Sequence, residues 1–146
     1  MHGPVSRRFR HRFRVRWAEV DPQKIVFNAR YLDYADVVIT EYWEAARAFR
    51  AWPDDFEVHV ARAEVDYRQP FRAREVIVGE AWTSRLGNSS VTTSIRLLDE
   101  GGALRTAIEL IQVHVDLSDG RPRPLPDWFR QAMTDFDASC QEGVGA

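Results

Sequence analysis

The chain contains one cysteine, Cys140, and one lysine, Lys24, among its 146 residues. A single thiol cannot form a disulfide within the chain, which excludes the disulfide frameworks of small secreted domains and favours the reducing cytoplasm. No apolar run approaches the ~20 residues that a membrane helix needs. The arginine-rich segment 7–16 is also not followed by an apolar stretch of signal-peptide length. We therefore expect a cytoplasmic protein without a membrane partner.

The chain also has no large excess of positive or negative charge. Its 20 basic and 22 acidic residues give a net charge of −2, which argues against nucleic acid as the main partner. With 45% hydrophobic residues, the chain is suited to fold around a core of its own. The length predicts a single domain over 1–146, with a core of about 9–135 and a flexible tail at 137–146.

From Phe9 to Trp17, aromatic or apolar side chains alternate with arginines. This period of two predicts a half-buried strand. The arginines indicate a solvated or charge-protected strand first, and a dedicated anion site only second.

A long helix is predicted over 31–48, because apolar residues recur there at helical spacing and neither proline nor glycine interrupts them. Asn28 stands where an N-cap is expected, and Trp52-Pro53 ends the pattern.

Four further strands are predicted after this helix, each followed by a turn signal. They cover 56–68, 75–86, 89–98 and 104–117. A proline-rich connector then leads to a short helix from Asp127 to about Phe136. One long helix between a first strand and a run of hairpin-linked strands predicts an α+β domain with a five-stranded antiparallel sheet.

With this order established, the segment from Arg16 to Tyr31, RWAEVDPQKIVFNARY, resembles the entry motif of the 4-hydroxybenzoyl-CoA thioesterase family. In that family an aspartate precedes a tyrosine by ten residues, with an apolar run between them. Residues 63–70, 84–90 and 121–126 resemble later parts of the family in the same order. The resemblance implies a hotdog fold, in which a curved antiparallel sheet wraps around a long central helix. It also implies acyl-CoA thioesterase activity with no cofactor beyond the CoA of the substrate, and homodimers or homotetramers with active sites at the subunit boundary.

Thioester hydrolysis requires a carboxylate that attacks the carbonyl or activates water, and a donor for the developing oxyanion. The resemblance assigns the first role to Asp21, as nucleophile or general base, and the second to the backbone N–H of Asn28. Without the resemblance, Asp21 would be read as the aspartate of an Asp-Pro turn, and Asn28 as part of a capped helix terminus.

Other candidates surround these two. Glu19, two residues before Asp21 in an expected strand, would share its face and could perturb its pKa, although a structural role is favoured. Tyr31 packs or lines the acyl pocket. Three roles are open for Lys24: it could lower the pKa of Asp21, bind a CoA phosphate, or be a solvated turn residue, which is the favoured interpretation.

The family's nucleotide-binding hairpin matches Arg85, Ser89 and Ser90, which are equally typical of a surface turn. His59 and His114 fit no metal-ligand spacing with each other or with Cys140, so no metal is expected.

The chain departs from the family where Asn28 replaces a frequent histidine, Lys24 a frequent glycine, and Ile39 an arginine, with Asp36 three residues before it. The missing histidine disfavours the first alternative, a hotdog dehydratase or hydratase. The second alternative is a non-catalytic acyl-CoA sensor on the same fold.

Overall fold

The computed structural model describes residues 7–141. The strands are β1 (Phe9–Arg14), β2 (Val58–Tyr67), β3 (Val76–Leu86), β4 (Ser90–Leu98) and β5 (Leu104–His114). A short 3-10 helix η1 (Trp17–Glu19) and the long helix α1 (Arg30–Phe49) lie between β1 and β2, and helix α2 (Asp127–Gln141) follows β5.

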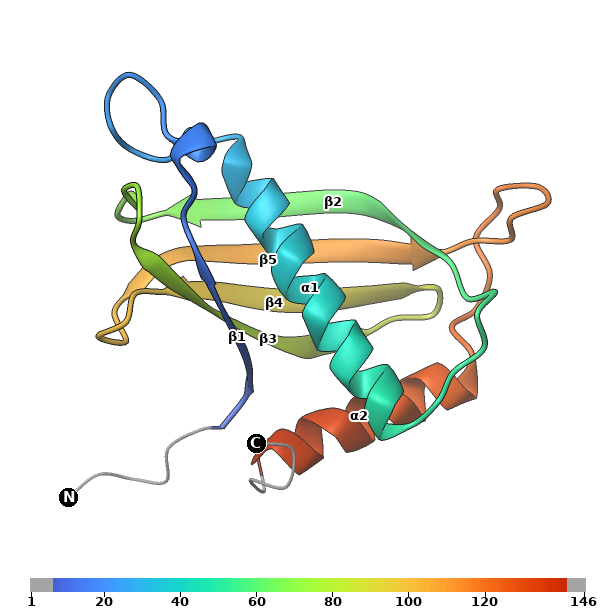
Figure 1. Cartoon of the computed structure of the whole chain (residues 1–146). Helices are drawn as coiled ribbons and strands as arrows, with labels where there is room; N and C mark the ends of the chain where they lie inside the picture. Colours follow the sequence, from blue (N-terminus) through green and yellow to red (C-terminus); the bar gives the residue numbers. More distant parts are fainter. Residues whose placement is uncertain (1–6, 142–146) are drawn as a thin grey trace.

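The strands form one five-stranded sheet in the order β1-β3-β4-β5-β2, with every neighbouring pair antiparallel. Helix α1 crosses one face of this sheet, while α2 lies beside the C-terminal end of α1 (Figure 1). This arrangement confirms the predicted α+β fold. It leaves β1 and β2 as the two sheet edges within residues 7–141.

Helix α1 approaches β3 closely at Gly79. A Cβ atom at this position would lie 2.2 Å from Cγ2 of Val38. Glycine is therefore required there by the close approach of the helix, and Val38 is fully buried as a result. The contact fixes the height of α1 above the strand.

Helix α2 is attached to both α1 and β3 through Asp137. Its carboxylate accepts hydrogen bonds from the backbone N–H of Thr83 at 2.9 Å and from the hydroxyl of Tyr42 at 2.5 Å. The expected end of this helix near Phe136 is wrong, because the helix continues to Gln141 and Cys140 is buried in it. Of the expected flexible tail, residues 142–146 lie outside the described residues.

Two local expectations are also corrected. Trp17 does not continue the apolar face of β1, because the strand ends at Arg14 and the turn into η1 leaves this side chain 70% exposed. Asn28 is not the N-cap, since α1 begins at Arg30 and Ala29 holds the cap position without a side-chain hydrogen bond.

Candidate active site

The candidate site is built on the loop that joins η1 to α1. An isolated bridge pairs Val20 with Val26, and a second bridge pairs Ile25 with Arg72 just before β3. Across the first bridge, the N–H of Asp21 donates to the carbonyl of Ile25 at 2.9 Å. These hydrogen bonds hold Asp21 at the beginning of a tight turn against the start of β3.

The Asp21 carboxylate is half-buried, and its Oδ1 accepts the backbone N–H of Gln23 at 2.8 Å. Within residues 7–141 no basic side chain forms an ion pair with it, and no hydrogen bond joins it to Asn28. The turn geometry that the Asp-Pro pair predicted is therefore present, while Oδ2 receives no hydrogen bond from any described residue.

The N-terminus of α1 lies at the other end of this loop. The N–H of Arg30 donates to the carbonyl of Phe27 at 2.9 Å, and the N–H of Tyr31 donates to the carbonyl of Asn28 at 3.3 Å. The hydroxyl of Tyr67 donates to the same Asn28 carbonyl at 2.9 Å. Among the described residues, the backbone N–H groups of Asn28 and Ala29 find no acceptor, so they are available to an oxyanion.

Glu19 does not share a face with Asp21, because residues 17–19 form η1 instead of a strand. Its side chain is 5% exposed and accepts hydrogen bonds from the Tyr34 hydroxyl at 3.0 Å and the Arg16 backbone N–H at 2.7 Å. The Arg16 guanidinium adds an ion pair at 3.0 Å. Burial raises the pKa of Glu19, but these hydrogen bonds outweigh it and hold the pKa below its ordinary value. The alternative coupling of Glu19 to Asp21 is absent, and Glu19 has the favoured structural role, in which it joins η1 to α1.

Tyr31 is 2% exposed, and its hydroxyl accepts the backbone N–H of Phe71 at 3.1 Å. Its ring packs in T-shaped, edge-to-face contacts with those of Tyr34 and Tyr67, at 5.7 and 5.1 Å between centroids. These are the contacts of a packing residue at the start of α1. Lys24 is exposed at the tip of the loop and has φ of +68°, a left-handed conformation that glycine adopts most easily.

The structure does not bring the predicted nucleotide contacts to Asp21 within one chain. Arg85 lies at the end of β3, and Ser89 and Ser90 lie at the turn into β4, whereas the loop of Asp21 contacts the segment before β3. The length of β3 separates the two places by about 30 Å. Figure 1 shows the loop before α1 and the β3–β4 hairpin at opposite ends of the sheet.

Three residues near the loop were missed by the sequence reasoning: Tyr67, Arg72 and Arg74. Tyr67 and Arg72 reach the loop through a hydrogen bond to Asn28 and a bridge to Ile25. Arg74 reaches the same end through its N–H, which donates to the carbonyl of Val15 at 3.2 Å. All of these contacts join residues far apart in the sequence, so no local pattern signals them.

Within the part of the chain that the structure describes, no three His, Cys, Asp or Glu side chains gather in a way that could hold a metal ion. His114 uses its Nδ1 atom in a 3.1 Å hydrogen bond with the carbonyl of Pro124, and His59 lies on the exposed edge strand β2. No helix of residues 7–141 is long and apolar enough to span a membrane.

Comparison with known proteins adds to this geometry. A sequence model of the thioesterase-like superfamily matches residues 15–133. No curated protein sequence is significantly similar to the chain.

Among solved structures, a thioesterase-superfamily protein from Jannaschia sp. CCS1 is 22% identical, with a TM-score of 0.81 over 92% of this chain and 96% of that one. A thioesterase from Thermus thermophilus, complexed with coenzyme A and Zn, is 28% identical, with a TM-score of 0.74 over 85% and 95%. A DHNA-CoA thioesterase from Staphylococcus aureus is 17% identical, with a TM-score of 0.76 over 92% and 93%. These likenesses confirm the hotdog fold that the entry motif predicted.

Proposed function

Because this chain belongs to the thioesterase-like superfamily, we propose that it hydrolyses acyl-CoA thioesters to a free carboxylic acid and CoA, with Asp21 as the catalytic carboxylate. One observation carries the proposal. A single loop holds a half-buried carboxylate at its start and leads, seven residues later, to an uncapped helix N-terminus with a free N–H at Asn28.

The N-terminus of α1 supplies the electrophilic half of the site. The free backbone N–H groups of Asn28 and Ala29 lie directly before the first residue of α1, a 20-residue helix whose dipole favours negative charge at this end. A thioester carbonyl placed against them would gain stabilisation as its oxygen becomes an oxyanion. Only backbone atoms act in this role, so the asparagine side chain is not required.

Asp21 supplies the other half through Oδ2, since Oδ1 accepts the Gln23 N–H. As a nucleophile, Oδ2 attacks the thioester carbon, the C–S bond breaks to release the CoA thiolate, and water then hydrolyses the acyl-aspartate anhydride. As a general base, Oδ2 takes a proton from water while the water oxygen attacks the same carbon. In both routes the thiolate leaves and is protonated, and one water is consumed.

We also propose that the working enzyme is a homodimer or homotetramer. The edge strand β2 has ten residues, with Val60 58% exposed and Tyr67 51% exposed, and such an edge is suited to pairing with a second copy. A second copy could also bring its Arg85, Ser89 and Ser90 to the CoA bound at Asp21. Light scattering at micromolar concentration should give a mass above one chain, and a monomer would contradict the proposal.

The Thermus thermophilus relative was crystallised with coenzyme A, which supports CoA as the carrier of the acyl group. The cytoplasm is the proposed location, because the one thiol of the described chain, Cys140, is free and buried.

The decisive experiment measures thiol release from short, medium, long and aromatic acyl-CoAs by the native protein and by Asp21→Asn and Asp21→Ala. Both variants should lose at least about 100-fold in turnover, the usual scale for a catalytic acid or base. Asp119→Asn is a matched control. Asp119 also accepts a backbone N–H two residues on, that of Arg121 at 2.8 Å, but lies in a different loop.

Circular dichroism and thermal melting should show all variants folded. Turnover retained in a folded Asp21→Ala protein would refute the role of Asp21. Acyl-CoA binding without turnover in the native protein would instead identify a binding protein, and addition of water to an enoyl-CoA would identify a hydratase.

A further inference from the structure

Two cationic residues near the candidate site adopt a backbone conformation that side chains disfavour. Lys24 has φ of +68° and Arg74 has φ of +72°, and they are the non-glycine residues with positive φ among residues 7–141. In this left-handed region, a Cβ atom crowds the backbone, so glycine is the residue of lowest strain. Side chains kept at such positions suggest a use for them outside the packing of the fold.

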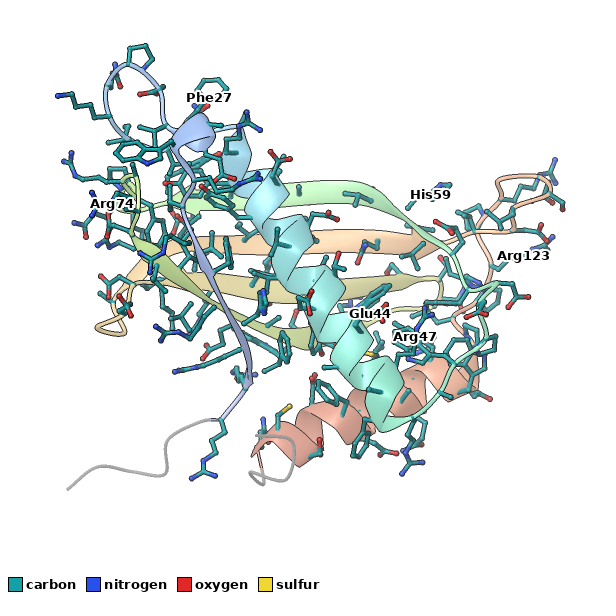
Figure 2. All side chains as sticks on the ribbon, in the orientation of Figure 1. Phe27, Glu44, Arg47, His59, Arg74 and Arg123 are labelled. Carbon is teal, nitrogen blue, oxygen red and sulfur yellow. The ribbon has the colours of Figure 1, made fainter. Side chains whose placement is uncertain are left out.

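Both residues lie at the same end of the sheet. Lys24 precedes Ile25, which is bridged to Arg72, and the guanidinium of Arg14 donates to the carbonyl of Arg74 at 2.6 Å. We call the exposed side chains of Arg14, Lys24, Arg72 and Arg74 the cationic rim. In Figure 2, Arg74 and Phe27 mark this end of the molecule.

The cationic rim differs from its neighbours in charge pairing. Arg16, Arg30 and Arg68 each form an ion pair with a carboxylate, at 3.0, 3.4 and 3.1 Å. Over the described part of the chain, no side-chain cation of the rim forms an ion pair; the Glu75 carboxylate accepts the backbone N–H of Arg72 at 2.8 Å but pairs its charge with Arg105. The rim therefore keeps its full positive charge for an external anion, beside the loop that carries Asp21.

We propose that the cationic rim binds the phosphate groups of the CoA moiety, so that the chain that contributes Asp21 also anchors its own substrate. This inference rests on the proposed thioesterase function; it takes up one of the roles considered for Lys24 and adds Arg14, Arg72 and Arg74 to it. In CoA the pantetheine arm separates the thioester from the phosphates, so an anchor near Asp21 but outside the helix N-terminus fits the substrate. Arg85 cannot serve the same Asp21 within one chain, because the length of β3 lies between them.

The test uses the double variant Lys24→Gly/Arg74→Gly and measures binding of CoA itself by calorimetry, so that no turnover is needed. Each substitution removes a charge and relieves a left-handed side chain. The melting temperature should therefore rise by about 2–4 °C. Removal of two exposed contacts should weaken CoA binding by about 3–20-fold.

Three further arms make the result specific. Lys24→Arg keeps the charge and should keep the affinity, while Arg121→Gly, which removes an exposed cation in the loop after β5, should change neither binding nor its salt dependence. The affinity of the native protein for CoA should fall as salt is added, and that of the double variant should fall less. Dephospho-CoA and 4′-phosphopantetheine show which phosphate the rim contacts, and pantetheine, which has none, should bind both proteins equally.

A double variant that is more stable and binds CoA as tightly as the native protein would overturn the inference. So would equal weakening for CoA and pantetheine. The thioesterase proposal fails separately, if thiol release does not depend on Asp21. Thiol release can depend on Asp21 even if the affinity for CoA does not depend on Lys24 and Arg74, so the two failures are distinguishable.

Discussion

Gly79→Ala should destabilise the protein through one steric contact between β3 and α1. The added methyl group would lie 2.2 Å from Cγ2 of Val38 and 3.2 Å from its Cγ1. Since carbon atoms pack at about 3.5–4.0 Å, the helix must rise by more than about 1 Å or the Val38 side chain must leave its rotamer. Val38 cannot turn into solvent, because it is fully buried.

Overpacking of this kind costs about 1–3 kcal/mol. For a chain of this size, that cost lowers the melting temperature by about 2–12 °C. Denaturant unfolding measures the change directly, with the midpoint expected to fall and the slope to stay the same. Turnover should fall as well, because the same helix carries the free N–H groups near Asn28.

The clash can be separated from other effects by a double-mutant cycle with Val38→Ala. This substitution removes both methyl groups that the new Cβ would meet, so the double variant should be at least about 1 kcal/mol more stable than the sum of the single changes predicts. Gly101→Ala is the control. A Cβ there would meet only the Asp99 Oδ1 at 3.4 Å, and its effect should stay within about 0.5 kcal/mol. Strict additivity in the cycle, or native stability in Gly79→Ala, would refute the reasoning.

One buried carboxylate, Glu19, and one half-buried carboxylate, Asp137, predict opposite pH dependences of stability. The pKa of Glu19 is lowered in the folded protein, so its contribution to the free energy of unfolding is present above its ordinary value of 4.5 and lost as pH falls through the lowered pKa. Tyr34→Phe removes one of the hydrogen bonds to Glu19, so it should raise the pKa of Glu19 and lower the free energy of unfolding by about 1.5–3 kcal/mol at neutral pH. An unchanged pH midpoint of acid unfolding in this variant would contradict the account. Burial raises the pKa of Asp137 above 3.8 despite hydrogen bonds from Tyr42 and Thr83, so its stabilising contribution is greatest below that value and is lost as pH rises through the raised pKa. Asp137→Asn should abolish this loss in a series of thermal melts, and an unchanged pH profile would show that the group does not titrate as described.

The order and type of the elements followed from the sequence because their patterns are local. Each pattern involves only a few neighbouring residues: the alternation before Trp17, the uninterrupted helical spacing of α1, and the turn signals between strands. The errors fell at element ends, where local patterns give way to tertiary contacts. The first strand stopped at Arg14 because the chain turns into η1, and α2 ran on to Gln141 because Cys140 is buried in its packed face.

The candidate site also has features that the sequence predicted and features that only the tertiary structure shows. The resemblance of the entry motif singled out Asp21 as the candidate carboxylate ahead of the long helix, although the N-cap expected at Asn28 lies at Ala29. It could not show that Glu19 turns inward to Tyr34, because that depends on a hydrogen bond between η1 and the helix. Nor could it show that Lys24 and Arg74 share a left-handed backbone, since φ is set by how the two loops close.

The sequence by itself determined the fold class and the element order, because each is written in short-range pattern, while the choice of Asp21 as the candidate carboxylate came from the family resemblance. Only the tertiary structure decided which charges stay unpaired beside that carboxylate and how far the Arg85 hairpin lies from it. Those properties arise when strands distant in sequence pair side by side, and antiparallel pairing of β3 with β1 and β4 sets distances that no local pattern contains.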